Sequence, residues 1–212
     1  MSLPAPGGAG IASNELPLFP LNAVLCPEGL LELRIFEARY LDLMSVCMRE
    51  KTPFGVVCLK SGREARTSRQ AVSLHEVGTL AALVDVDSVE TNILSVRCRG
   101  THRFSLGATR QQADGLWLGD AAAIADDPVV PPTPAQAGIV KSLADAVEAL
   151  AAQGARPFLE PLRFDSAGWV ANRWCDILPL PLDVKQRLMA LADPAVRLDL
   201  VDSLMRTRHD TH

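Results

Sequence analysis

Residues Leu31–Tyr40 read LELRIFEARY and carry two different periodicities within one short stretch. In the first half, apolar and polar side chains alternate, which is typical of a half-buried β-strand. From Phe36 onward the apolar residues recur at helical spacing, because Tyr40, Leu43 and Cys47 follow at intervals of four, three and four. We therefore expect a strand that runs directly into a helix.

Strand patterns dominate the chain on both sides of this stretch. Apolar and polar residues alternate over 94–98, Gly100 follows, and the alternation resumes over 102–106. Because glycine adopts backbone angles that turns require, this pattern predicts two strands joined by a turn. Strands are also expected at Leu31–Ile35, Phe54–Leu59, Thr79–Val86 and Leu116–Ile124.

The character of the sequence changes near residue 125. Residues 125–134 contain four prolines and predict a stiff connector. Thr133, Pro134 and Gln136 then match a capping box at the start of a helix. Three further helices are expected to begin at Ser166, Asp183 and Asp193. Apolar faces are predicted at Ile139, Leu143, Val147 and Leu150, at Val170, Trp174 and Ile177, and at Val196, Leu200 and Leu204.

These patterns predict an α+β protein with a strand-rich part and a helical part. Several short strands separated by turn signals are typical of a small barrel or sandwich, here with one inserted helix. We expect a disordered N-terminus over 1–13, a strand-rich subdomain over 14–124, the connector over 125–134 and a helical bundle over 135–208.

Several short motifs can be located along the chain. They read LPLFPL at 16–21, PEG at 27–29, PFGVV at 53–57, VGTLA at 77–81, RGTHRF at 99–104 and LPLPLDVKQRL at 178–188. With Leu31–Tyr40 in its place, their order resembles the N-terminal, substrate-binding domain of Lon proteases and its stand-alone relatives. The resemblance covers residues 14–208. It implies a PUA-like six-stranded β-barrel with one inserted helix, followed by a C-terminal helical bundle.

The resemblance also implies a non-catalytic module that recognises polypeptides, without a cofactor. The expected partners are unfolded or degron-bearing polypeptides, together with a protease or chaperone. Lon proteases add an ATPase module with a phosphate loop and a protease domain with a Ser-Lys dyad. None of the lysines here follows a glycine, which excludes a Gly-Lys-Ser/Thr loop, and the chain ends soon after the expected bundle. We therefore expect neither activity.

Composition limits the compartment and the partners. With 21 basic and 25 acidic residues the net charge is −4, which disfavours a dedicated nucleic-acid binder. The five cysteines include no Cys-x-x-Cys pair, so we interpret them as buried apolar residues in a reducing cytoplasm. No apolar run reaches the roughly 18 residues that span a membrane. The N-terminus lacks the pattern of a signal peptide.

The stretch after the first predicted strand supplies one group of candidate partner-binding residues. Arg34, Glu37 and Arg39 could present a polar surface to a client polypeptide. The alternative is structural: the three pair with one another at the strand-to-helix junction, while Phe36 and Tyr40 fill the core.

Three other segments complete the candidate set, namely LPLFPL, the RGTHRF motif that contains Arg103, and the expected helix that contains Trp169. The prolines of LPLFPL allow either an exposed docking edge or a first strand folded into the core. Trp169 lies off the predicted apolar face of its helix, so it is a candidate contact as well as a core residue. The candidate partner-binding residues are Leu16, Leu18, Phe19, Arg34, Glu37, Arg39, Arg103 and Trp169.

Two other classes of function stay open at this point. An RNA-binding module would use the basic residues Lys60, Arg63, Arg66 and Arg69, although a solvated loop explains them equally. A small-molecule enzyme would need a nucleophile and a base or paired acids. The residues that invite this interpretation are Cys47, His75 and His102, together with Asp85 and Asp87, and nothing in their spacing brings them together.

Overall fold

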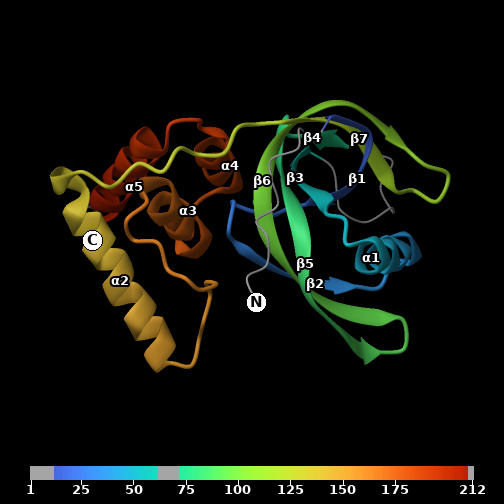
Figure 1. Cartoon of the computed structure of the whole chain (residues 1–212), viewed down its shortest axis with the longest axis horizontal. Coiled ribbons are helices and arrows are strands. Elements are labelled where there is room, and N and C mark those ends of the chain that lie inside the picture. The colour runs from blue at the N-terminus through green and yellow to red at the C-terminus, as the bar shows by residue number, and fades with distance from the viewer. Residues whose placement is uncertain (1–11, 62–71, 210–212) are drawn as a thin grey trace, which may run out of the picture.

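The computed structural model describes residues 12–61 and 72–209, and it has a mixed α+β fold (Figure 1). We call the strands with α1 the sheet half, and the remaining helices the helical half. The strands are β1 (Ala12–Leu21), β2 (Leu30–Ile35), β3 (Phe54–Ser61), β4 (Ser73–Leu74), β5 (Val77–Glu90), β6 (Ile93–Gln111) and β7 (Trp117–Ala123). The helices are α1 (Ala38–Glu50), the 3₁₀ turn η1 (Pro134–Gln136), α2 (Ala137–Ala152), α3 (Ala167–Ile177), α4 (Leu182–Ala190) and α5 (Pro194–His209).

The seven strands form one sheet that closes on itself. The order is β1-β7-β6-β5-β3-β4, and β1 also pairs with β3 in parallel, with Leu18 opposite Gly55. β2 pairs antiparallel with the first part of β6, which places Ile35 opposite Leu94. The resemblance implied six strands, and the seventh, β4, has only two residues. β1 begins at Ala12, two residues before the expected boundary.

The expected turn at Gly100 is wrong, because β6 runs without interruption from Ile93 to Gln111. Gly100 sits inside the strand, where the connection between β1 and β2 presses against it. The Gly100 amide donates to the Gly29 carbonyl at 2.9 Å, and a Cβ on Gly100 would lie 2.2 Å from the Cys26 carbonyl oxygen. The glycine therefore permits a close backbone approach rather than a change of direction.

Helix α1 packs its apolar face against the sheet. Tyr40, Leu43 and Cys47 are buried, as the helical spacing predicts. Phe36 is the exception, with 66% of its surface exposed. Because α1 begins only at Ala38, Phe36 precedes the helix and does not share its buried face. The expectation that Phe36 fills the core is wrong.

The helix starts follow the capping residues with one exception. The Thr133 amide donates to the Gln136 side chain at 2.9 Å, which confirms the capping box. The Ser166 hydroxyl caps α3, and the Asp193 carboxylate accepts from the second and third residues after it, which caps α5. Asp183 does not cap α4, since it lies inside the first turn and Pro181 occupies the cap position.

The buried face of α5 differs from the predicted one. Val196 and Leu200 are 45% and 46% exposed, so the prediction that they face the core is wrong. The buried side chains are instead Arg197, Leu198 and Val201. The apolar spacing misled because an arginine occupies part of the inward face, where it makes polar contacts described below.

The two halves lie side by side and are joined by the extended connector (Figure 1). Contacts cross between them at α4, where the Gln186 side chain donates to the Val77 carbonyl at 2.8 Å and the Thr79 hydroxyl contacts the Met189 sulfur at 3.7 Å. Within the described ranges, no helix combines the length and apolar character that crossing a bilayer requires.

Candidate functional site

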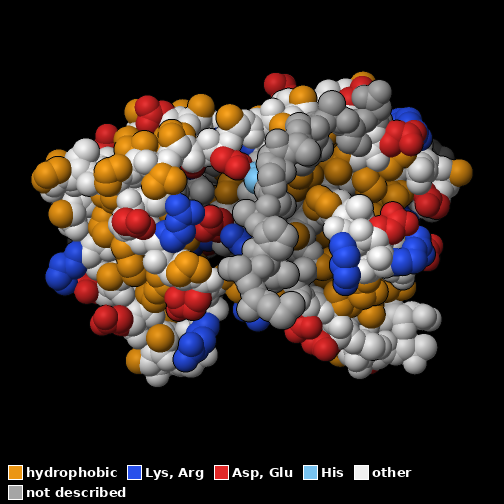
Figure 2. Space-filling view, in the orientation of Figure 1, with side chains coloured by type: hydrophobic (Ala, Val, Ile, Leu, Met, Phe, Trp, Pro, Cys, Tyr) orange, Lys and Arg blue, Asp and Glu red, His pale blue; other side chains and the backbone are white. Residues whose placement is uncertain are grey.

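A shallow groove opens beside the turn from β2 into α1. It has a volume of about 260 Å³ and lies between the end of β1 and the length of β2. Phe19 and Tyr40 stack at its base, with ring centroids 3.9 Å apart and planes 15° from parallel. In Figure 2, apolar atoms gather between α1 and β2. The groove is lined by Phe19, Pro20, Leu21, Glu32, Leu33, Arg34, Ile35, Phe36, Glu37 and Tyr40, and we call it the Phe36 groove.

Arg39 anchors the start of α1 beside the groove through contacts with the nearby Glu37 and with Gly115, which is distant in the sequence. The Arg39 guanidinium contacts Glu37 at 2.6 Å, donates to the Gly115 carbonyl at 3.2 Å and lies 4.8 Å from the centre of the Tyr40 ring. Arg39 is 7% exposed, so its charge is compensated rather than presented to solvent. These contacts hold Glu37 and Arg39 in place, while the neighbouring Phe36 stays 66% exposed.

The rim of the groove carries charges of both signs in water. Arg34 pairs with Glu90 at 3.3 Å, and both side chains are more than half exposed. Exposed pairs of this kind contribute little to stability, because solvent screens them and both side chains keep their mobility. An apolar ring and weakly held charges together form a surface that a partner could cover.

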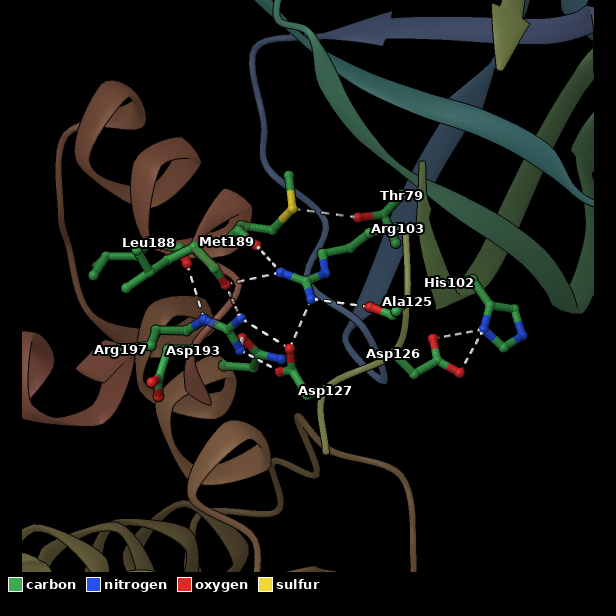
Figure 3. A network of polar contacts seen from close by, with 12 residues as sticks. Thr79, His102, Arg103, Ala125, Asp126, Asp127, Leu188, Met189, Asp193 and Arg197 are labelled. Atoms are coloured by element: carbon green, nitrogen blue, oxygen red, sulfur yellow. Dashed lines mark hydrogen bonds and ion pairs between the residues drawn. The ribbon is translucent and has the colours of Figure 1, made fainter. Parts of the chain in front are cut away.

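A second cluster lies at the junction of the two halves (Figure 3). The Arg103 guanidinium donates to Asp127 at 2.7 Å and to the carbonyls of Met189 and Leu191 at 3.1 and 2.9 Å. Arg197 donates to Asp127 from the other side, to the Leu188 carbonyl at 2.9 Å and to the Asn172 side chain at 3.2 Å. We call Arg103, Asp127 and Arg197 the junction network.

The junction network is largely shielded from water, although 17% of the Asp127 side chain is exposed. Arg103 and Arg197 are 3% and 1% exposed. Burial lowers the pKa of Arg103, while the attraction of Asp127 opposes that change. One carboxylate thus bridges two cations, and backbone carbonyls and the Asn172 side chain accept further hydrogen bonds from them. The arrangement binds the halves to each other and to the connector.

The structure divides the predicted partner-binding residues into three groups. Arg34, Glu37 and Phe19 line the Phe36 groove, although Phe19 is nearly buried. Arg39 does not line the groove, but it pairs with Glu37. Arg103 belongs to the junction network. The others are buried in the cores: Leu16, Leu18 and Trp169, with Trp169 packed edge-on against Phe158 and Phe164.

The residues considered for other functions do not converge. Lys60 pairs with Glu76 at 3.4 Å, while Arg63, Arg66 and Arg69 lie outside the described residues. On the face seen in Figure 2, described basic side chains are separated by acidic and apolar ones. His102 contacts Asp126 at 2.8 Å. Cys47 is buried, and burial raises the pKa of its thiol.

The two aspartates Asp85 and Asp87 do not form a metal centre with other described residues. Asp85 and Asp87 project into solvent along β5, as their alternation predicts. Among the described residues, no group of three or more histidine, cysteine, aspartate or glutamate side chains is arranged to hold a metal ion.

Sequence patterns did not identify the residues that distinguish the Phe36 groove and the junction network. Phe36 appeared to continue a helical face, and only the helix start at Ala38 shows that it does not. Asp127 lies in the proline-rich connector and Arg197 on a helix, 70 residues apart, so local spacing cannot pair them. An arginine within an otherwise apolar helical face is the one signal that could have identified Arg197.

Comparison with known proteins agrees with this architecture. Residues 15–207 match the family model described as the ATP-dependent protease La (LON) substrate-binding domain. The crystal structure of a Lon N-terminal domain protein from Xanthomonas campestris is similar, with 29% identity, a TM-score of 0.73, and coverage of 90% of this chain and 98% of that one. The N-terminal domain of a Mycobacterium avium complex Lon protease shares the fold at 13% identity, with a TM-score of 0.62 and coverage of 89% and 96%. No curated protein matches the chain.

Proposed function

The chain belongs to the family of Lon substrate-binding domains, and on that premise we propose that it is a non-catalytic module that recognises polypeptides at the Phe36 groove. The partners we propose are unfolded or degron-bearing polypeptides, presented to a protease or chaperone. The observation that carries the location is the exposed Phe36 ring beside the stacked pair of Phe19 and Tyr40. Aromatic side chains at the centre of a small apolar surface contribute most of the binding energy in many interfaces.

The groove supports this proposal better than the junction of the two halves does. The junction lies within reach of the proline-rich connector, so it is the alternative location for contact with a client. There the polar groups of Arg103, Asp127 and Arg197 already bond to one another and to carbonyls. A client would have to replace those bonds. At the groove it would cover apolar surface that is already exposed, which is favourable without a rearrangement.

We extend the proposal to fold class, boundaries and compartment. The closed sheet is interpreted as a PUA-like barrel over 14–124, joined through the connector 125–134 to a helical bundle over 135–208. The pairing of β1 with both β7 and β3 supports the barrel. All five cysteines are free and buried, which supports a reducing cytoplasmic compartment.

The test is a binding titration with a fluorescently labelled, reduced and alkylated polypeptide that cannot fold. We expect Phe36→Ala to weaken binding about tenfold, the loss typical of an interfacial aromatic residue. The matched control is Val129→Ala, since Val129 is 67% exposed but lies in the connector. It should bind as the wild type does.

Two results would count against the proposal. If the wild-type protein does not bind the unfolded polypeptide above background, polypeptide recognition is wrong. If it binds and Phe36→Ala binds equally well, recognition stands but the groove is not its site.

A further inference from the structure

Strand β2 has one open edge, and the Phe36 groove lies beside it. One edge of β2 pairs with the first part of β6, while the other pairs with no strand among the described residues. Residues from both faces of β2 line the groove, including Glu32 and Leu33, but no residue of β6 does. A hollow over a face of the sheet would also touch the neighbouring strand. The groove therefore borders the open edge of β2.

The pairing of β2 with β6 shows which backbone groups lie on that edge. The Gly100 amide donates to the Gly29 carbonyl at 2.9 Å, and the register then continues without a shift along the whole of β2. Hydrogen-bonded and non-hydrogen-bonded pairs alternate in an antiparallel ladder, so every second residue after Gly29 bonds to β6. The backbone N–H and C=O groups of Leu30, Glu32 and Arg34 therefore point away from β6, towards the open edge.

These outward groups have no backbone partner elsewhere in the described part of the chain. A strand edge with a row of free donors and acceptors is a template on which another extended chain can pair. The hydrogen bonds it offers are to main-chain groups, which every unfolded polypeptide has available and which a folded protein has already used. The open edge therefore suits a partner that is extended rather than folded.

The side chains beside the edge indicate which extended segments fit. Leu31 and Leu33 lie on the inner face of β2 and pack against the core of the sheet half, next to Phe19 and Tyr40. Successive side chains of a strand point to opposite faces. A strand added to this edge would therefore place every second side chain over the apolar floor of the groove, where apolar residues are favoured.

The outer face of β2 adds a preference for charge. Glu32 and Arg34 are both exposed there. Arg34 pairs with Glu90, whereas Glu32 forms no ion pair with another described residue. Opposite charges on neighbouring strands stabilise their pairing, and like charges oppose it. A basic side chain of the added strand is therefore favoured beside Glu32, and an acidic one is disfavoured.

We propose that an extended polypeptide segment binds in the Phe36 groove as an additional strand on the open edge of β2. The segment has apolar residues at every second position and a basic residue beside Glu32. This inference rests on the proposed function and specifies the conformation and the sequence class of the client. Main-chain pairing supplies contacts that are common to all clients, while the apolar floor and Glu32 select among them.

The first experiment titrates the full chain with a fluorescently labelled synthetic peptide in which leucine alternates with serine and lysine. Two further versions carry N-methyl groups at all odd or at all even positions. Because alternate amides of a strand point to the same edge, each version blocks one edge of the peptide. We expect one version to bind about tenfold more weakly and the other to bind as the parent does. Equal binding by both versions would overturn the pairing of strands.

The second experiment removes one donor from the edge of the protein. Glu32→Pro lacks the outward amide but breaks no bond to β6, and proline is tolerated at such edge positions. It should weaken binding of the parent peptide about tenfold. The matched control, Glu32→Ala, keeps the amide. It should bind far better than Glu32→Pro and should lose the preference for lysine over glutamate in the peptide.

The outcomes separate this inference from the proposed function. If the wild type binds unfolded polypeptide and Phe36→Ala does not, but both N-methylated peptides bind equally, recognition at the groove stands and strand pairing is wrong. If the wild type binds neither peptide nor polypeptide, the proposed function itself fails. A wild-type dimer in sedimentation that Glu32→Pro dissociates would assign the edge to a second copy and overturn the polypeptide partner. The N-methylated peptides need no variant, so a Glu32→Pro protein that does not fold leaves the answer intact.

Discussion

Arginine and acidic residues meet both at the junction network and at the Phe36 groove, but only the groove also carries an ion pair that lies in solvent. Asp127 is shared by Arg103 and Arg197, which are almost fully buried. At the groove, Arg39 and Glu37 form a largely buried pair, whereas Arg34 and Glu90 form a pair in solvent. Similar ion pairs therefore contribute differently to stability, and the degree of burial decides how much each pair contributes.

The contrast indicates where each function is located in the molecule. A buried charge that loses its partner by substitution is left without water, so removal of Asp127 from the junction network should be costly. Charged groups at the groove lose little free energy when they exchange water for a partner. Covering Phe36 is favourable, because apolar surface is removed from water. The junction holds the shape and the groove is free to bind.

The largest expected effect comes from Asp127→Ala, because it leaves two buried guanidinium groups without their carboxylate. We expect the free energy of unfolding to fall by about 3–5 kcal/mol, the range measured when one partner of a buried ion pair is removed. Equilibrium unfolding in urea, followed by circular dichroism, measures the change.

The matched control for that prediction is Glu90→Ala at the groove, which removes an exposed carboxylate from Arg34. Its expected cost is below about 1 kcal/mol. Equal losses in the two variants would show that burial does not separate the two regions as proposed.

The next effect concerns the pH dependence of the junction itself. Burial raises the pKa of Asp176 to about 6 from its ordinary 3.8, although Arg173 and Lys185 favour the charged form. Between these values the folded state binds more protons than the unfolded state, so this contribution to stability is present below pH 3.8 and is lost as pH rises through about 6. The loss amounts to about 3 kcal/mol.

Unfolding in urea across this pH window, for the wild type and for Asp176→Asn, measures that contribution. The variant keeps an oxygen that can accept from Arg173 but cannot ionise, so its stability should lack the decline. Parallel pH curves for the two proteins would be inconsistent with a titrating Asp176.

A smaller effect is expected at Gly100, where two backbone segments approach each other closely. Gly100→Ala would place a Cβ 2.2 Å from the Cys26 carbonyl oxygen. Overpacking of this kind costs about 1–3 kcal/mol. Gly138→Ala is the matched control, since a Cβ there meets nothing within 4 Å and α2 should gain about 0.5–1 kcal/mol. Thermal unfolding of both variants tests the pair, and a stable Gly100→Ala protein would argue against the close approach.

Much of the fold could be predicted from local patterns, because local chemistry determines it. The alternation over 31–35 and the caps at Thr133, Ser166 and Asp193 each depend on neighbours within a few residues. Gly100 could not be interpreted this way. The same glycine suits a turn or a close approach, and only the distant Cys26 carbonyl determines which one occurs.

The candidate site was predictable only in part for a related reason. Leu31–Tyr40 was identified as distinctive, and Arg34 and Glu37 do line the groove. Exposure of Phe36 depends on where α1 begins, and spacing does not fix a helix start that lacks a side-chain cap. Arg103 was selected by motif, but its role depends on Asp127 and on carbonyls of the helical half.

The smallest effect on stability is expected at the residue that we propose to matter most for binding. Phe36→Ala removes a ring that is 66% exposed, so the free energy of unfolding should change by less than about 0.5 kcal/mol. Tyr40→Ala, four residues on, removes a ring that is 4% exposed and stacked on Phe19, and should cost about 3–5 kcal/mol. Urea unfolding of the two variants gives both values. A large loss for Phe36→Ala would place the ring in the core of the folded protein in solution. The tenfold loss of polypeptide binding would then report damage to the fold rather than removal of a contact.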